Sequence, residues 1–127
     1  MRIDESIKNA EKILPGVPLS DDKKKDIRWQ RIIAIEEFIQ TNPEEVWNFI
    51  KKWGAHEQED IRMAIATCLL EHMLEHHYKL IFPKLENEIK ENYLFFDTLS
   101  RCAKFGQANT KVNSKRFDDL IKKYSKV

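Results

Sequence analysis

The chain has 127 residues, 34% of which are Asp, Glu, Lys or Arg, and its formal net charge is +1. This length predicts one domain, residues 1–127, with a single hydrophobic core. A net charge near zero favours neither nucleic acid nor a membrane surface as partner, and no apolar run reaches the ~18–20 residues of a membrane span. The N-terminus lacks the apolar core of a signal peptide. We therefore expect a cytoplasmic protein with no membrane partner.

Every predicted element is a helix, because no stretch shows the alternation of a strand. Pro15 and Gly16 end the first helix, and Ser20 is a good N-cap for the second. Pro43 fits the first position of the third helix, and Gly54 is expected to end it in a left-handed conformation. Asn113 or Ser114 is expected to cap the last helix. The predicted ranges are 4–14, 21–40, 43–53, 59–82, 83–90 and 93–105, with a final helix around 117–124.

Hydrophobic residues at helical spacing predict which side of each helix faces the core. In the first helix these residues share one side, and in the second they are spread more widely. The residues expected inside are Ile3, Ile7, Ala10, Ile13 and Leu14 in the first, and Ile27, Trp29, Ile32, Ile33, Ile35, Phe38 and Ile39 in the second.

The helix over residues 60–82 is predicted to be central. Hydrophobic residues cover more than half of its circumference, so it needs neighbours on more than one side. A narrow strip is expected to face water, and Pro83 is expected to close or kink the helix. The apolar set is Ile65, Ala66, Leu69, Leu70, Met73, Leu74 and Ile81, and the exposed strip is Thr67, Glu71, Glu75, Tyr78 and Lys79.

A short internal repeat precedes two of these helices. Asp26-Ile27-Arg28 recurs 34 residues later as Asp60-Ile61-Arg62. A period of this size is typical of stacked helical hairpins, and short and long helices alternate along the chain in agreement with it. An irregular helical bundle is the alternative architecture.

The Asp-x-Arg at the head of an Ala- and Leu-rich second helix resembles the HEAT family of α-helical repeats. The resemblance covers roughly residues 20–105, and the third helix pair lacks the triplet. It implies stacked antiparallel hairpins, an α-α superhelix closed here by a C-terminal capping helix, with acidic and basic side chains that bridge successive repeats. It also implies a non-catalytic scaffold or adaptor that binds a protein partner along the repeat face.

Charge is distributed unevenly along the chain. Residues 36–60 carry seven acidic and two basic side chains, whereas residues 101–127 carry eight basic and two acidic ones. These segments either complement each other within the fold or form a polarised binding surface. The basic segments 23–31 and 101–126 also support an alternative function, nucleic-acid binding. The candidate partner-binding residues are Lys23, Lys24, Arg28, Arg31, Arg101, Lys104, Lys111 and Arg116.

A histidine-rich stretch supports a third hypothesis. His72, Glu75 and His76 form H-x-x-E-H, a pattern that places two imidazoles on one helix face, where both can reach one zinc ion. The interpretation that we prefer is that these histidines are ordinary packing or surface residues. We expect no other cofactor and no catalytic residue, and we interpret Cys68 and Cys102 as core thiols in a reducing compartment.

Overall fold

The computed structural model describes residues 1–16 and 26–125. These residues form helices joined by short loops and contain no strand, so the all-α prediction is confirmed. None of the described helices is both long and apolar enough to cross a membrane. The elements are α1 (Ile3–Ile13), α2 (Ile27–Ile35), η1 (Glu36–Phe38), α3 (Pro43–Trp53), α4 (Glu59–Ala64), η2 (Ile65–Leu70), α5 (Glu71–Glu91), α6 (Tyr93–Ser100), η3 (Gly106–Asn109) and α7 (Lys111–Tyr124).

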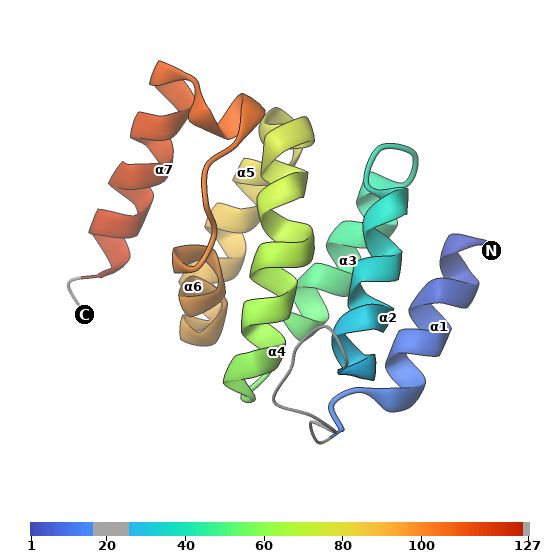
Figure 1. The fold of residues 1–127 in the computed structure, drawn as a ribbon. Helices are drawn as coiled ribbons and strands as arrows, with labels where there is room; N and C mark the ends of the chain where they lie inside the picture. The colour runs from blue at the N-terminus through green and yellow to red at the C-terminus, as the bar shows by residue number, and fades with distance from the viewer. Residues whose placement is uncertain (17–25, 126–127) are drawn as a thin grey trace.

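The helix that begins as α4 continues through the π-helical segment η2 into the first turns of α5, up to His77, and it occupies the middle of the molecule. The later part of α5 lies behind this helix in Figure 1. In Figure 1, α2 lies beside it, and α1 and α7 lie at opposite sides of the fold. The predicted apolar residues are fully buried here (Ile65, Ala66, Leu69, Leu70, Met73, Leu74 and Ile81). The central position of this helix is therefore confirmed. Its expected wet strip is partly wrong, because Glu71 and Tyr78 are buried.

The central helix kinks at His77, six residues before Pro83. His77 has φ −136° and ψ 41°, outside the helical region, whereas Pro83 lies inside α5. The side chain of Gln107 holds the kink from a distant loop. Its Nε2 donates to the His76 carbonyl over 2.8 Å, and its Oε1 accepts from the Tyr78 amide over 2.9 Å. The predicted break at Pro83 was wrong because this contact moves the break.

Helix α6 ends at Ser100, earlier than the predicted Phe105. The chain then crosses the central helix, where the Ala103 amide donates to Glu71 Oε2 over 2.9 Å. Gly106 has φ +51° and lies against Glu75, so a Cβ there would come within 2.8 Å of Glu75 Cγ. Glycine is therefore required where the loop meets the helix, and it begins η3 instead of ending a helix.

Several local predictions need correction. Asp26 caps α2 by accepting from the Arg28 amide, whereas the predicted cap, Ser20, lies outside the described residues. Thr110, and neither Asn113 nor Ser114, caps α7. Gly54 is right-handed, with φ −69°; a Cβ there would lie 2.9 Å from Phe95 Cε2, so the position needs glycine for close packing.

The hydrophobic core is one connected cluster that draws residues from α1 to α7. Trp29, Trp47 and Trp53 are all buried in it. Two residues expected inside are exposed instead: Ile27 by 36% and Ile33 by 46%. α2 uses a narrower face than its apolar content suggested.

Candidate functional site

An open groove runs along α1, between this helix and α3. Its volume is about 590 Å³, and two isoleucines, Ile3 and Ile7, supply its apolar lining. Both pack against the core, as the sequence predicted, but they are only partly buried. Ser6 and Ala10 are the buried residues of α1, and Leu14 directly after it is buried too. The apolar side of α1 is thus incompletely covered, and the outer atoms of Ile3 and Ile7 line the groove.

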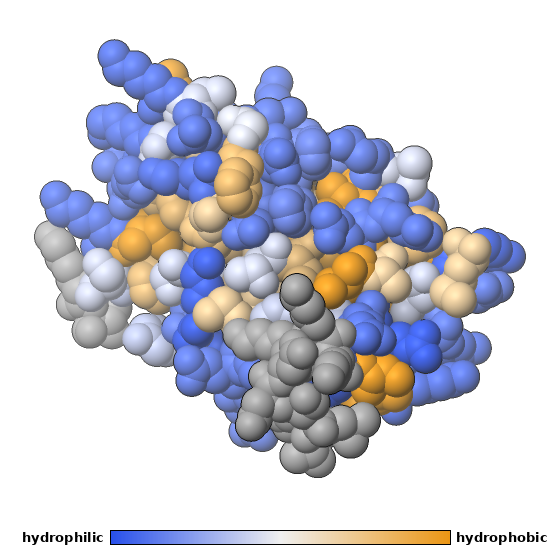
Figure 2. Space-filling view, viewed as in Figure 1, coloured by the Kyte–Doolittle hydropathy of each residue, from blue (hydrophilic) through white to orange (hydrophobic). Residues whose placement is uncertain are grey.

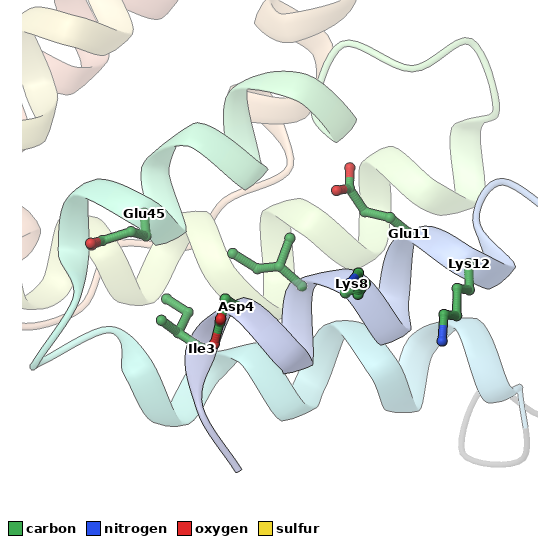
Figure 3. Close-up of a pocket in the computed structure, with 7 residues that line it drawn as sticks. Ile3, Asp4, Lys8, Glu11, Lys12 and Glu45 are labelled. Atoms are coloured by element: carbon green, nitrogen blue, oxygen red, sulfur yellow. The ribbon is translucent and has the colours of Figure 1, made fainter.

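Charged side chains frame this groove (Figure 3). Glu11 points toward α3, where Lys52 Nζ lies 2.6 Å and Trp53 Nε1 3.1 Å from its Oε2. The hydrogen bond from Lys52 lowers the pKa of Glu11 and outweighs its partial burial. Glu11 is therefore already paired and holds α1 against α3.

The remaining rim charges separate by sign along the helix. Asp4 and Glu45 lie at the end where α1 and α3 begin, and Lys8 and Lys12 lie further along α1. A second hollow of about 590 Å³ shares Ile3, Asp4 and Glu45, so the depression continues past the start of α1. Its further lining residues are Met1, Arg2, Phe38 and Asn42. This trough thus has Asp4 and Glu45, with Arg2 paired to Asp4 over 3.2 Å, at one end, and Lys8 and Lys12 toward the other.

Those predicted basic residues that the structure describes do not gather into one face. Arg28 is buried, with only 2% of its side chain exposed, and it bonds to Asp26 and Asp60, so it cannot present its guanidinium at a surface. Arg31 is exposed on α2, and Arg116 lies on α7, where its guanidinium is 4.9 Å from the Phe82 ring centre. The central helix separates these two helices in Figure 1.

Carboxylates already engage two other predicted basic residues. Arg101 bonds to Asp97 over 2.9 Å and to Glu59 over 2.8 Å, and Lys104 Nζ lies 2.8 Å from Asp118. Lys111 is exposed at the start of α7, whereas Lys23 and Lys24 lie outside the described residues. The contact of Arg101 with Glu59 joins the basic segment 101–127 to the acidic segment 36–60, so part of the expected charge complementarity lies within the fold.

The histidine cluster forms hydrogen bonds within one side of α5. His72 Nδ1 lies 2.9 Å from Glu75 Oε1, and His76 Nε2 lies 3.5 Å from the same oxygen. The hydrogen bond with His72 lowers the pKa of Glu75. Phe105 stacks on the His72 ring at 6.2 Å between ring centres. In the part of the chain that the structure describes, no group of three or more His, Cys, Asp or Glu side chains is placed to hold a metal ion.

The two cysteines are free thiols. Burial raises the pKa of Cys68 to about 11 and that of Cys102 well above its ordinary value. Both therefore stay protonated near neutral pH and are poor nucleophiles. This agrees with their interpretation as packing residues.

The trough beside α1 was missed because periodicity places Ile3 and Ile7 on the same side of the helix as Ala10 and Leu14. No local signal marked the trough, because these four residues form a single narrow row at heptad spacing. Comparisons with models of protein families, with curated proteins and with solved structures found no match for this chain. The geometry of its surfaces is the basis on which a function can be proposed.

Proposed function

We propose that this chain is a non-catalytic protein-interaction module of the cytoplasm, built from HEAT-like helical hairpins. The observation that carries the proposal is the trough along α1, which the partly buried Ile3 and Ile7 line between charged rims. Helical modules commonly bind an amphipathic helix through such an apolar groove, with anchors at helical spacing.

Contacts between successive helices support the HEAT-like part of the proposal. Arg28 bonds to Asp26 at the head of its own helix and to Asp60 at the head of α4. Arg62, the equivalent arginine of the second triplet, donates to Asp97 of α6 over 2.9 Å. Each arginine thus reaches an acid on a later helix, as the resemblance implies. Asp97 supplies this acid although the third helix pair has no Asp-Ile-Arg.

The exposed surface offers further apolar contact area along the helical face. Figure 2 shows hydrophobic residues in patches across the face that carries α2 and α4, with hydrophilic residues between and around them. Ile33 and Phe105 are 46% and 43% exposed. A protein partner suits such a mixed surface better than nucleic acid does, because phosphate groups require clustered positive charge.

Nucleic-acid binding is the alternative function, through the basic segments. Arg31, Lys111 and Arg116 are the described residues that favour it, since all three are exposed. Arg28, Arg101 and Lys104 favour it less, because carboxylates engage each of them. Binding through the remaining cations would weaken steeply as salt is added, because bound counterions are released.

Site-specific photo-crosslinking tests the proposed docking surface. A photoreactive residue replaces Lys8 on the trough rim, and a matched control replaces exposed Val112 on α7, with the full chain expressed in cells. We expect a covalent adduct with a polypeptide from position 8, absent from position 112 and lost when Ile7→Asp is added. An adduct that forms equally at both positions, or survives Ile7→Asp, would contradict the proposal, as would the absence of any adduct at position 8.

A further inference from the structure

The side of α1 that lines the trough is complementary to itself. We propose that the trough along α1 binds α1 of a second copy of this chain, antiparallel and related by a two-fold axis. This inference rests on the proposed function, because it names the occupant of the same trough. In such a contact residue i of one copy faces residue j of the other, and j faces i, so each favourable pair forms twice.

The spacing of α1 supplies these reciprocal pairs. Ile3 and Ile7 are four residues apart, and so are Asp4 and Lys8; each pair therefore forms a row along the helix. In an antiparallel arrangement, Ile3 of one copy lies opposite Ile7 of the other, and Asp4 lies opposite Lys8. Matching flanks face each other across the two-fold axis, so the apolar row meets the apolar row and the charged row meets the charged row.

The ends of the trough extend the charge complementarity. Glu45 of α3 lies at the same end as Asp4, and Lys12 lies near the other end of α1. Reversal of direction brings the Asp4 and Glu45 end of each copy to the Lys8 and Lys12 end of the other. Glu11 does not compete, because Lys52 already pairs with it.

A parallel arrangement would place like charges together and align the two helix dipoles unfavourably. α1 has Asp4 and Glu5 in its first turn and Lys12 in its last, so antiparallel contact also joins opposite ends. Arg2 lies 3.2 Å from Asp4, but both side chains are mostly exposed, so this contact contributes little and can exchange for Lys8 of the second copy.

The size of the surface predicts a weak dimer. An 11-residue helix is about 16 Å long. One such helix pair with the adjacent edge of α3 falls below the roughly 1,200 Å² that stable interfaces bury. We therefore expect association at high protein concentration only, with a dissociation constant on the order of 0.1 mM.

Sedimentation velocity of the full chain, from about 10 µM to about 1 mM, tests this proposal. The wild type is expected to pass from monomer to dimer, and Ile7→Asp is expected to weaken dimerisation about tenfold or more. A wild type that stays monomeric over the whole range overturns the proposal.

A charge exchange makes the test specific to the antiparallel pairing. One variant carries Asp4→Lys with Glu45→Lys, and another carries Lys8→Asp with Lys12→Asp. Each alone places four like charges in both troughs and is expected to remain monomeric, whereas an equimolar mixture is expected to form a heterodimer at least as well as the wild type. A mixture that associates no better than either variant overturns the pairing. These substitutions are at exposed or rim positions, and circular dichroism checks that both variants keep the wild-type helix content.

Val112→Asp on α7 is the matched control and is expected to leave the dimer unchanged. Loss of the dimer in this variant would overturn the assignment to α1.

The mass of the photo-crosslinked adduct from position 8 distinguishes a dimer of this chain from a complex with a different protein. An adduct of twice the chain mass supports the dimer. An adduct with a different protein keeps the proposed function and overturns the dimer. No adduct contradicts the proposed function, and sedimentation velocity at high protein concentration then decides the dimer.

Discussion

Both Asp-Ile-Arg segments stand at the start of a helix, but their arginines contact the neighbouring helices at sites that differ in burial. Arg28 is 2% exposed and uses all three of its side-chain nitrogens, bonding to Asp26, the Pro15 carbonyl, Gln58 and Asp60. Arg62 has a side chain 10% exposed and donates to Asp97, whose side chain is 30% exposed. We call the first contact the α2–α4 joint and the second the α4–α6 joint.

The difference in burial between the two joints determines how much stability the same sequence motif contributes. In the α2–α4 joint, Asp26 is also buried, so losing the arginine leaves an unpaired charge away from water. In the α4–α6 joint, Asp97 accepts from Arg101 as well as from Arg62 and keeps one cation if the other is removed. The α2–α4 joint therefore depends on a single arginine, whereas two arginines stabilise the acidic residue of the α4–α6 joint.

The largest expected effect comes from removing the buried arginine. Arg28→Ala leaves Asp26 without its counter-ion in the interior and is expected to lower the free energy of unfolding by about 3–5 kcal/mol. Urea unfolding followed by circular dichroism measures this loss. Arg31→Ala, one turn further along α2 and exposed, is the control and is expected to change stability by less than about 0.5 kcal/mol. Similar losses in the two variants would mean that the α2–α4 joint is not structurally important.

A smaller loss is expected in the α4–α6 joint. Arg62→Ala removes hydrogen bonds to Asp97 and to the carbonyls of His56 and Glu57, but Arg101 still neutralises Asp97. The expected cost is about 1–3 kcal/mol, measured by the same urea titration. A loss of unfolding free energy equal to or larger than that of Arg28→Ala would contradict the claim that the α2–α4 joint contributes more stability.

Acid is expected to weaken both joints. Burial raises the pKa of Asp26 and of Asp97, but hydrogen bonds from Arg28, and from Arg101 and Arg62, outweigh it, so both pKa values lie below the ordinary one. The stability they contribute is therefore fully present above the unfolded-state pKa of about 4 and is lost as pH falls through the lower folded-state values.

Urea unfolding between about pH 5 and pH 2 measures this loss. Asp97→Asn should remove part of the pH dependence, because one of the two depressed carboxyl groups no longer titrates. A variant whose stability falls as steeply with acid as that of the wild type would show that Asp97 does not contribute.

Local periodicity predicted the parts of the fold that depend on nearby residues. The helices and the central position of residues 60–76 follow from the spacing of Ile65, Leu69 and Met73, which all face the core. The kink at His77 could not be predicted in this way, because it depends on Gln107, some thirty residues later in the chain. A proline is a local signal for a break, and here a distant side chain overrides it.

The site was less predictable than the fold. The resemblance carried by the repeated triplet implied that its acidic and basic residues bridge neighbouring helices, but it did not indicate that Arg28 would be buried, since arginine is usually found at surfaces. Ile3 and Ile7 pack against the core as expected, but a helix wheel could not show that they are left partly exposed, because it does not show how many neighbours α1 has. Whether an apolar row is core or surface depends on the helices packed against it, and those are set by tertiary contacts.

The central claim is that Arg28 joins α2 to α4 through Asp60, and a double-mutant cycle tests it most directly. The cycle combines Arg28→Met with Asp60→Asn, and a second cycle combines Arg101→Met with Glu59→Gln at an exposed ion pair. We predict a coupling free energy of at least about 1.5 kcal/mol for Arg28 and Asp60, of which only Arg28 is buried, and less than about 0.5 kcal/mol for the exposed pair. Equal coupling in the two cycles, or none between Arg28 and Asp60, would contradict the account.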